Sequence, residues 1–516
     1  MLKLKGKMLV LGFLLSIFCG CVAAQEKEMP KEKTMKENPF YMGVYVYDYA
    51  IKNVAKERNR DFLEFFEEQF DILQKNGVNA MYLSGNNDRE LFGEYLKLSE
   101  KYGIKLIPQL DFAYFRPGWD DKQMRTNAEK AGKFISKYIN SPQILAWTVK
   151  EEILSADINK LARYYSMIRE YAPDAKFCLH YSQLGTAEQP APDSEILGTN
   201  RYAFYWTSSG GGYLASPAFA LNWLRNQAAI FQEKAAQRGA DFMLTITDGG
   251  AQGYRKAKSL DLDKKLDCKI KKYAEEGRMG WGKTVTPEDE FYYYWEYYRT
   301  PGNCMKAQAW IGVLEGARLF FCWSFTPPTK ATANATVFDF MLSKEKVGRL
   351  WTLAGHPGKP NPQLAEFKEA SREIRRYERI ITRMYKLPAS PVLTNEKQFY
   401  FNRAFSFPEL KGKIIVIHNG NVGTWPENSA YHFKEDADIR IDTDGNLVGY
   451  KPLSEPMEAK FEVTDLDSSN AIFDIESGNQ IKNTDGGYSV NIMPGSGKLL
   501  FIGTSEELKV LRQLMP

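Results

Sequence analysis

Two periodicities of hydrophobic residues alternate along residues 40–325. Short apolar runs rich in aromatic and β-branched residues have the length of buried strands, whereas the segments between them carry apolar residues every three or four positions. The second pattern predicts amphipathic helices, and Gly77 and Gly103 mark where two of them end. The expected strands are 40–48, 78–83, 104–112, 144–149, 176–181, 196–202, 242–247 and 318–325. The expected helices are 61–76, 88–102, 126–139, 157–171, 218–238 and 305–317.

Strands that alternate with helices in this way are typical of an α/β protein with a (β/α)8 TIM barrel. The competing architecture is a doubly wound parallel sheet, which usually carries a glycine-rich phosphate-binding loop after its first strand. In this chain the first strand ends in Tyr47-Asp48-Tyr49-Ala50, which contains no glycine. The sequence therefore predicts the barrel.

The hydrophobic pattern changes after Phe325. Residues 361–384 predict one long charged helix, and from residue 390 onward turns rich in Asn, Asp and Gly separate short alternating runs. We expect a barrel domain over 39–388 and an all-β, sandwich-like domain over 389–516. An insertion at 255–300, with an aromatic run at 290–298, is expected to lie over the barrel mouth as a lid. The expected strands of the second domain are 398–405, 413–419, 437–442, 458–464, 471–474 and 498–502.

The first residues predict export rather than a folded element. Basic residues precede an apolar run at 8–18 that is too short to span a bilayer, and small residues follow it, so 1–24 are typical of a secretory signal. The leader can be processed in two ways. Cleavage after Ala24 would release a soluble protein, whereas a lipobox ending at Cys21 would give a lipid-anchored one. We favour lipid anchoring at Cys21, with 25–38 as a polar tether. This places the protein in the periplasm or at the cell surface.

Composition narrows the chemistry. The 516 residues include 68 Lys and Arg against 64 Asp and Glu, and a net charge of +4 gives no support for nucleic-acid binding. The chain has four His, and its cysteines beyond the leader form no CxxC pair, so neither a zinc site nor a dense disulfide framework is expected. We expect no metal and no organic cofactor. The aromatic content of 14% suits a large core or stacking on a ligand.

In a barrel the reactive side chains lie at the carboxyl ends of the strands, which limits the search to a few short stretches. Each candidate there has a plainer alternative, because strand-end aspartates often cap loops, a lone strand histidine is as often structural, and tryptophans often pack in cores. The residues that we expect to bind substrate are Asp48, Asp111, His180, Tyr181, Asn200, Arg201, Trp206 and Trp323.

Several stretches together carry a resemblance to known enzymes. Trp-Thr-Val-Lys-Glu-Glu at 147–152 ends the fourth strand, glycine-led runs at 77–83 and 103–108 open the second and third, and 299–323 supplies the last helix and strand. In this order they resemble the barrel glycoside hydrolases of the β-galactosidase- and agarase-like clan, over roughly residues 40–330. There the fourth strand often ends in Asn/Asp-Glu, and that Glu is the acid/base. The resemblance therefore implies that Glu152 is the acid/base, with Glu151 in place of the Asn or Asp.

Glycosidic cleavage requires two carboxyl groups, one as acid and one as nucleophile or base. Successive side chains on a strand point to opposite faces, so only one of Glu151 and Glu152 is expected to face the mouth. We favour Glu152, with Glu151 as the alternative. The resembled clan has a Glu at the end of the seventh strand, where this chain has Asp248. Asp248 is thus the candidate second carboxylate, with Glu288 or Glu290 of the insertion as alternatives.

The resemblance implies a bacterial glycoside hydrolase that acts on an extracellular oligo- or polysaccharide. A first alternative is a non-catalytic glycan-binding lipoprotein on a degenerate barrel, because the expected glutamate of the seventh strand is missing. A second is a barrel enzyme of another class, such as a metal-dependent hydrolase. The scarcity of His and the lack of an H-x-H or H-E-x-x-H motif argue against the second alternative.

Overall fold

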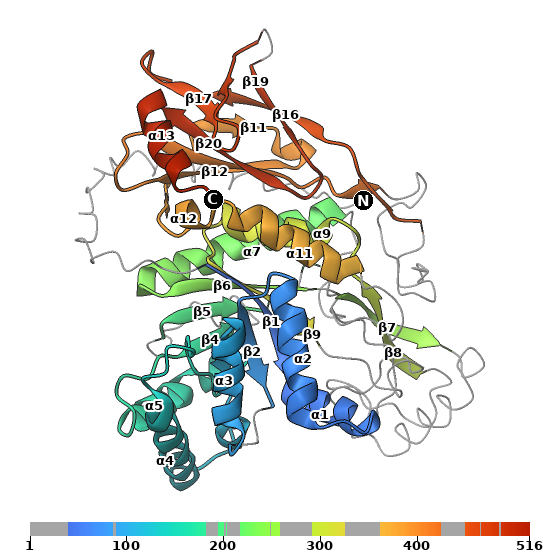
Figure 1. Cartoon of the computed structure of the whole chain (residues 1–516), viewed down its shortest axis with the longest axis vertical. Helices are drawn as coiled ribbons and strands as arrows, with labels where there is room; N and C mark the ends of the chain where they lie inside the picture. Colours follow the sequence, from blue (N-terminus) through green and yellow to red (C-terminus); the bar gives the residue numbers. More distant parts are fainter. Residues whose placement is uncertain are drawn as a thin grey trace, which may run out of the picture. The chain divides into compact units, whose positions relative to one another are not determined.

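A parallel sheet of seven strands organises the chain up to residue 325 (Figure 1). Its order is β3-β2-β1-β9-β6-β5-β4, and every neighbouring pair is parallel. This computed structural model describes residues 40–85, 89–181, 194–200, 203, 217–247, 249–257, 292–325, 362–424, 449–464, 466–484 and 487–516. The strands are β1 (Tyr41–Tyr47), β2 (Ala80–Ser84), β3 (Lys105–Pro108), β4 (Cys178–Tyr181), β5 (Ile196–Thr199), β6 (Asp241–Thr247) and β9 (Leu319–Phe325).

The concave face of this sheet has a hydrophobic core of its own. On β1 the side chains of Tyr41 and Tyr45 belong to this inner core, whereas those of Met42 and Val44 belong to the outer one, as the two-residue period of a strand requires. The rings of Tyr82 on β2 and His180 on β4 stack with their centroids 5.2 Å apart, although these strands are not neighbours in the sheet. The sheet is therefore curled, so that strands near its two edges face each other.

Residues 144–149, which were expected to form a strand, lie between the two edge strands. Isolated parallel bridges pair Ile144 with Leu106 on the β3 side and Trp147 with Phe177 on the β4 side. Ala146 contributes to the inner core. The backbone of this segment thus contacts both edges of the curled sheet without forming a continuous strand.

Helices follow most strands and cover the outer face. The helix α2 begins where the carboxylate of Asp61 accepts a hydrogen bond from the backbone N–H of Glu64. The helix α3 ends at Gly103, whose φ of 64° lies in the left-handed region that favours glycine. All six expected helices are present, and α1 is an additional one. The helices are α1 (Asp48–Glu57), α2 (Phe62–Lys75), α3 (Phe92–Tyr102), α4 (Asp121–Tyr138), α5 (Ile158–Arg169), α7 (Pro217–Arg238) and α9 (Cys304–Leu314), with 3₁₀ turns at Asp111–Ala113 and Ser155–Asp157.

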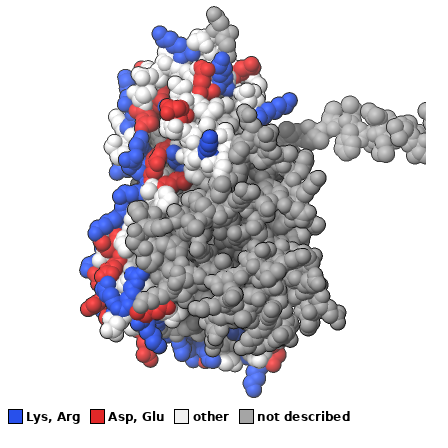
Figure 2. Space-filling model, turned by 90° about the vertical axis from the view of Figure 1, so that its right-hand side faces the viewer, with Lys and Arg blue, Asp and Glu red and all other residues white. Residues whose placement is uncertain are grey.

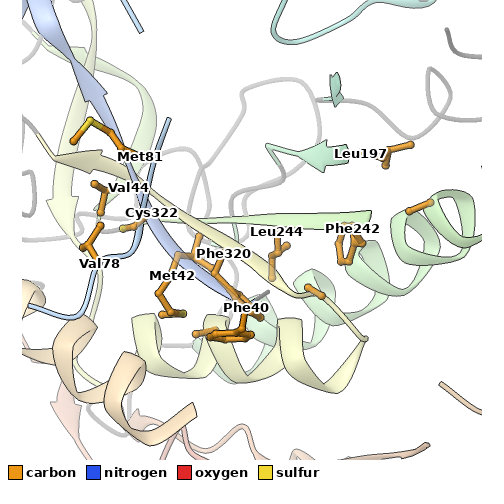
Figure 3. Close-up of a cluster of buried hydrophobic side chains, with 14 of the residues drawn as sticks. Phe40, Met42, Val44, Val78, Met81, Leu197, Phe242, Leu244, Phe320 and Cys322 are labelled. Atoms are coloured by element: carbon orange, nitrogen blue, oxygen red, sulfur yellow. The ribbon is translucent and has the colours of Figure 1, made fainter. Parts of the chain in front are cut away.

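The outer core lies between the strands and these helices. Phe40 and Met42 of the first strand region and Phe320 of β9 extend from the sheet toward a neighbouring helix (Figure 3). The glycine at 312 on α9 permits the close approach, since a Cβ there would lie 2.1 Å from Cε1 of Phe320. Close packing of this kind fixes the strands, and with them the strand ends that carry the candidate site.

The expected lid region contributes a two-stranded antiparallel ladder. The strands β7 (Gly249–Ala257) and β8 (Tyr292–Arg299) pair with each other, and β8 contains most of the aromatic run of the predicted lid. Residues 258–291 lie outside the described residues, and so do the alternatives Glu288 and Glu290.

Two larger antiparallel sheets and one short two-stranded ladder form the described part of the C-terminal region. The helix expected over 361–384 is divided into α11 (Pro362–Arg375) and α12 (Glu378–Ile381), with Tyr377 as the N-cap of the second. The helix α13 (Ser505–Gln513) follows the last strand, and the expected strand 437–442 lies outside the described residues. One sheet has the order β10 (Tyr385–Lys386), β12 (Tyr400–Ser406), β13 (Lys413–Asn419), β20 (Gly497–Gly503), β17 (Ala471–Asp474) and β18 (Gln480–Ile481). The other consists of β11 (Val392–Thr394), β16 (Met457–Val463) and β19 (Tyr488–Ile492), and β14 (Gly423–Thr424) pairs with β15 (Lys451–Pro452).

The larger of these sheets is buried on both faces. On β13 the side chains of Ile415 and Ile417 pack in a core with the three-stranded sheet, whereas Ile414 and Val416 belong to the same core as the helices of the parallel sheet. The indole of Trp310 on α9 lies so close to β20 that a Cβ on Gly497 would meet it at 2.4 Å. Pro39–Pro516 accordingly form one compact unit, and the boundary expected between 388 and 389 stays a prediction.

A buried ion-pair cluster joins the turn before β9 to the C-terminal region. The carboxylate of Glu315 is fully buried and lies 2.5 Å from Nζ of Lys386 and 3.0 Å from the guanidinium of Arg403. Two cations balance this carboxylate, which offsets part of the cost of removing it from water.

Candidate active site

The carboxyl ends of the parallel strands meet at one edge of the curled sheet. The register places Tyr47 of β1 beside Ser84 of β2, and Thr247 of β6 beside Trp323 of β9. Reactive groups of parallel α/β sheets lie at this edge, because the loops that follow the strands converge there. We therefore built the candidate site from the described residues at these strand ends.

Glu151 stands at the end of the segment that bridges the two sheet edges. Its carboxylate Oε1 lies 3.8 Å from Nδ1 of His180, and its side chain is 21% exposed. The backbone is held on one side by Tyr114, whose hydroxyl accepts from the N–H of Glu151 at 3.1 Å. On the other side the N–H of Ile153 donates to the carbonyl of His180 at 3.1 Å. The turn is thus fixed between β3 and β4. The Glu151 carboxyl lies half-buried at the edge where the carboxyl ends of the strands meet, which we call the mouth.

The surroundings of Glu151 favour its protonated form. Burial raises the pKa of its carboxyl to about 8, and the negative charges of Glu152 and Asp111 act in the same direction. A hydrogen bond from Tyr82 and the charge of Lys150 oppose this rise in pKa. A carboxyl that keeps its proton at neutral pH is able to act as a general acid.

Glu152 differs from its neighbour in conformation and in exposure. Its φ of 49° lies in the left-handed region, which costs a non-glycine residue roughly 1 kcal/mol. The residue as a whole is exposed, but partial removal of its carboxyl from water still raises the pKa of Glu152, whereas the charge of Lys150 lowers it. Of the two glutamates, Glu151 approaches the buried His180, whereas Glu152, which the sequence favoured as the acid, is exposed. Which of the two acts as the acid stays a prediction.

A chain of polar side chains continues from His180 across the inside of the sheet. The hydroxyl of Tyr45 lies 2.9 Å from Nδ1 and 3.2 Å from Nε2 of His180, and 3.4 Å from Oγ1 of Thr245. Thr245 in turn donates to Oδ1 of Asn200 at 3.3 Å. Burial lowers the pKa of His180 to about 3, so the ring is neutral at neutral pH. These groups connect β1, β4, β5 and β6 below the mouth.

Two aspartates lie on the other side of Glu151, after β1 and β3. Asp48 is buried and accepts a hydrogen bond from the hydroxyl of Tyr95 at 3.3 Å, and burial raises its pKa to about 7. Asp111 accepts from the amide of Gln109 at 2.6 Å, and burial raises its pKa as well. The same Gln109 accepts from the hydroxyl of Tyr82 at 3.4 Å, so Asp111 is linked through it to the residue that contacts Glu151.

An aromatic pair forms the part of the mouth between β1 and β9. The indole Nε1 of Trp323 donates to the hydroxyl of Tyr47 at 2.9 Å, and the rings of Tyr47 and Tyr49 lie 5.8 Å apart. Both Trp323 and Tyr47 are partly exposed. A flat, half-exposed indole is able to hold the apolar face of a sugar ring.

The structure brings together several of the expected site residues. Glu151, Asp111 and His180 lie in one cluster, Asn200 is joined to it through Thr245, and Trp323 lies at the same edge. Tyr181 is buried in the outer core, on the opposite face of β4 from His180, and does not join this cluster. The following residues lie outside the described residues: Asp248, Arg201, Trp206 and Cys21.

Sequence reasoning missed four members of the cluster. Tyr45, Tyr82, Gln109 and Tyr114 all contact Glu151, His180 or Asp111, directly or through one side chain. Tyr45 and Tyr82 precede the strand ends, so they appeared to be core residues. The available signal was that both tyrosines occupy equivalent positions on neighbouring strands. A buried tyrosine hydroxyl requires a hydrogen-bond partner, so two of them indicate polar groups inside the sheet.

The described residues form neither a strongly charged patch on the face shown in Figure 2 nor a metal-binding cluster. Lys and Arg side chains alternate with Asp and Glu over the described part of the face in Figure 2. Within the described ranges no group of three or more His, Cys, Asp or Glu side chains is arranged to hold a metal ion. None of the helices described is long and apolar enough to cross a bilayer.

Comparisons with known sequences give no assignment. No protein-family model matches the chain, and no curated protein matches its sequence.

Solved structures give distant likenesses to glycoside hydrolases. An α-amylase of Anoxybacillus is 7% identical, with 90% of this chain and 98% of that one covered and a TM-score of 0.44. An α-amylase of Geobacillus thermoleovorans in complex with acarbose is 8% identical, with the same coverage and a TM-score of 0.46. A β-glucuronidase of an uncultured Clostridium species is 12% identical over 65% of this chain, with a TM-score of 0.37, and the chain spans 51% of its length. These likenesses are too distant to assign a function to this chain.

Proposed function

We propose that this protein is a glycoside hydrolase in which Glu151 is the general acid. The observation that carries the proposal is the position of the Glu151 carboxyl, half-buried at the strand ends and 3.8 Å from a buried, neutral histidine. A glycosidic oxygen is a poor leaving group unless an acid protonates it, and a carboxyl with a pKa of about 8 carries that proton at neutral pH. Trp323 and Tyr47 supply a surface for the sugar at the same edge.

The second carboxylate is proposed to be Asp248, which directly follows Thr247 at the end of β6. Retention of configuration requires a carboxyl separation of about 5–5.5 Å, and inversion requires roughly 6.5–9.5 Å. Asp111 is the alternative among the described residues, because its charge acts on Glu151. The proposal includes closure of the curled sheet into a complete eight-stranded barrel through residues 144–149, as in the β-galactosidase- and agarase-like clan that the sequence resembles.

The adjacent glutamates provide the experiment. Glu151→Gln removes the acidic proton but keeps the shape of the side chain, and we expect it to lower kcat by about 10³-fold on natural glycosides. Glu152→Gln is the matched control, and we expect a loss of less than about tenfold because its side chain is exposed. The opposite pattern would assign the acid to Glu152. Glycan binding without turnover in the wild type would instead favour the glycan-binding lipoprotein.

We also propose that the chain is exported and anchored through Cys21, which suits an extracellular oligo- or polysaccharide substrate. The support is the sequence pattern of residues 1–24. Labelling with radioactive palmitate in a bacterial host should modify the wild type but not Cys21→Ala. Absence of label from both would favour cleavage after Ala24 and a soluble product.

A further inference from the structure

The imidazole of His180 is held from two sides within the inner core. Its side chain is buried, and it stacks on Tyr82 with an angle of 22° between the rings. The hydroxyl of Tyr45 lies within 3.2 Å of both ring nitrogens. Packing against Tyr82 and hydrogen bonding to Tyr45 therefore both restrict the orientation of the ring. Together they leave it little freedom to rotate.

Gly198 on the neighbouring strand β5 provides the space for this ring. A Cβ on Gly198 would lie 2.3 Å from Cδ2 and 2.5 Å from Nε2 of His180, and 2.8 Å from Cε of Met243. The backbone of Gly198 is not in the left-handed region, so its conformation is open to any residue. A glycine inside a strand costs roughly 0.5–1 kcal/mol relative to alanine. A glycine is therefore required at position 198 because the imidazole of His180 occupies the space of a Cβ, and not because of the strand conformation.

His180 contacts the Glu151 turn through both its side chain and its backbone. Its Nδ1 lies 3.8 Å from Oε1 of Glu151. Its carbonyl accepts a hydrogen bond from the N–H of Ile153, two residues after Glu151. A displacement of His180 from the space above Gly198 would therefore move the Glu151 carboxyl and the turn together.

We propose that Gly198, His180 and Tyr45 form a positioning clamp that fixes the carboxyl of Glu151 at the mouth, with His180 as the positioning residue. The catalytic consequence rests on the proposed function, whereas the clamp itself requires no substrate. The clamp acts without forming an ion pair, because the buried ring is neutral. The imidazole thereby holds the carboxyl in place without itself adding a positive charge that would favour loss of the proton.

Several other titratable groups lie near Glu151. Those that change their protonation in the same pH range would contribute to a titration of the Glu151 carboxyl. Burial keeps the hydroxyls of Tyr47, Tyr82 and Tyr114 and the thiol of Cys178 protonated, since it raises the pKa of each. The charged neighbours are Asp111, Glu152 and Lys150. Of these groups, only the carboxyls of Asp111 and Glu152 are able to titrate together with Glu151.

The test is Gly198→Ala, compared with Gly312→Ala. Both add one methyl group against an aromatic ring, but Gly312 is on α9 at the outer face and meets Phe320. Both variants should lower Tm. Gly198→Ala should lower kcat about 10- to 100-fold with KM within about twofold, because a displacement near 1 Å is sufficient for such a loss. Gly312→Ala should retain kcat and the pH dependence of the wild type.

A second measurement works without any substrate. The carboxyl carbon of Glu151, assigned in ¹³C NMR spectra by its absence from Glu151→Gln, is titrated in the wild type and in Gly198→Ala. Displacement toward solvent should lower the titration midpoint of Glu151 by about one pH unit or more. His180→Gln should cause the same change, and Gly198→Ala should add little in that background because both act through one contact.

The outcomes separate the two proposals. A wild type without activity on any glycoside overturns the proposed function. The titration midpoint of Glu151 in the variants then still tests whether the clamp exists. An unchanged Glu151 midpoint in folded Gly198→Ala and His180→Gln overturns the clamp, whatever the activity. Loss of kcat in Gly312→Ala equal to that in Gly198→Ala would also overturn it, because the effect would then come from overpacking alone.

Discussion

The indole Nε1–H of Trp323 donates a hydrogen bond of 2.9 Å to the hydroxyl of Tyr47. The two residues lie 276 positions apart in the sequence, at the ends of neighbouring parallel strands. This bond fixes the plane of the indole relative to the strand that precedes Asp48. A ring held in one orientation loses little entropy when a sugar stacks on it, so this edge is suited to bind carbohydrate.

The first prediction concerns sugar binding at this indole. In the inactive Glu151→Gln background, Trp323→Ala should weaken oligosaccharide binding about tenfold or more, which corresponds to about 1.4 kcal/mol. Tyr47→Phe removes only the hydrogen bond, and we expect a loss within about threefold. Isothermal titration calorimetry measures both. Equal affinities in Trp323→Ala and its parent would show that the sugar does not stack there.

The second prediction concerns the pH dependence of activity. The general acid must be protonated, so kcat/KM should fall as pH rises through the pKa of Glu151, about 8. Lys150 lowers the pKa of Glu151, and Lys150→Met should therefore move this alkaline limb to higher pH. The exposed Lys130 on α4 supplies the control, Lys130→Met, which should leave the profile unchanged. A limb that moves to lower pH in Lys150→Met would contradict the assignment.

The third prediction concerns the pH dependence of stability at Asp48. Its pKa is raised from 3.8 to about 7 by burial, so the folded state is favoured while the carboxyl is protonated. This contribution is complete below pH 4 and is lost as pH rises toward 7. Asp48→Asn should therefore leave stability nearly unchanged at pH 4 and raise it at pH 8, by roughly 4 kcal/mol at most. Urea unfolding at the two pH values measures the difference, and a gain that is equal at both would exclude this cause.

The fourth prediction concerns the buried carboxylate of Glu315. Glu315→Gln would leave Lys386 and Arg403 without their anion, and we expect a loss of about 3–5 kcal/mol in the free energy of unfolding. The control is Glu129→Gln, which breaks an exposed pair with Lys133 on α4 and should cost less than about 1 kcal/mol. Similar losses in the two variants would show that the cluster contributes little.

The fifth prediction addresses the second carboxylate by chemical rescue. Asp248→Ala should lower kcat by about 10³-fold or more if this residue is the nucleophile or the base. Added azide should then restore turnover and yield a glycosyl azide, because a small anion fits the space of the missing carboxylate. Asp111→Ala serves as the comparison, and rescue of this variant alone would transfer the role to Asp111.

The order of strands and helices was predictable because each element carries its own periodic pattern. The strand β1 and the helices α2 and α9 all lie within two or three residues of their expected bounds. The division of the helix expected over 361–384 was not predictable, because its charged pattern continues across Arg375 and Tyr377, where one helix ends and the next begins. The short helix α1 was missed, since its residues continue an aromatic strand without a breaker.

The site was predictable in its location but less so in its composition. The rule that strand ends carry the chemistry led to Asp111, His180 and the pair Glu151 and Glu152, of which Glu152 was favoured as the acid. The relative placement of Glu151 and Glu152 depends on the left-handed φ of Glu152, which no sequence pattern near it indicates. Tyr45 and Tyr82 contribute through hydroxyl groups whose partners are far away in the sequence, so only the three-dimensional arrangement identifies them.

The burial of β13 on both faces has a consequence for how this protein can change over evolution. Ile414 and Val416 fill the core beneath α9, where Trp310 packs against the neighbouring strand at Gly497. An independently folding module can be lost, duplicated or exchanged between proteins, because its removal exposes no interior. Removal of these sheets would expose the indole of Trp310 and the apolar side of α9 to water. The C-terminal sheets are therefore expected to be inherited together with the parallel sheet that carries the candidate site, as one heritable unit.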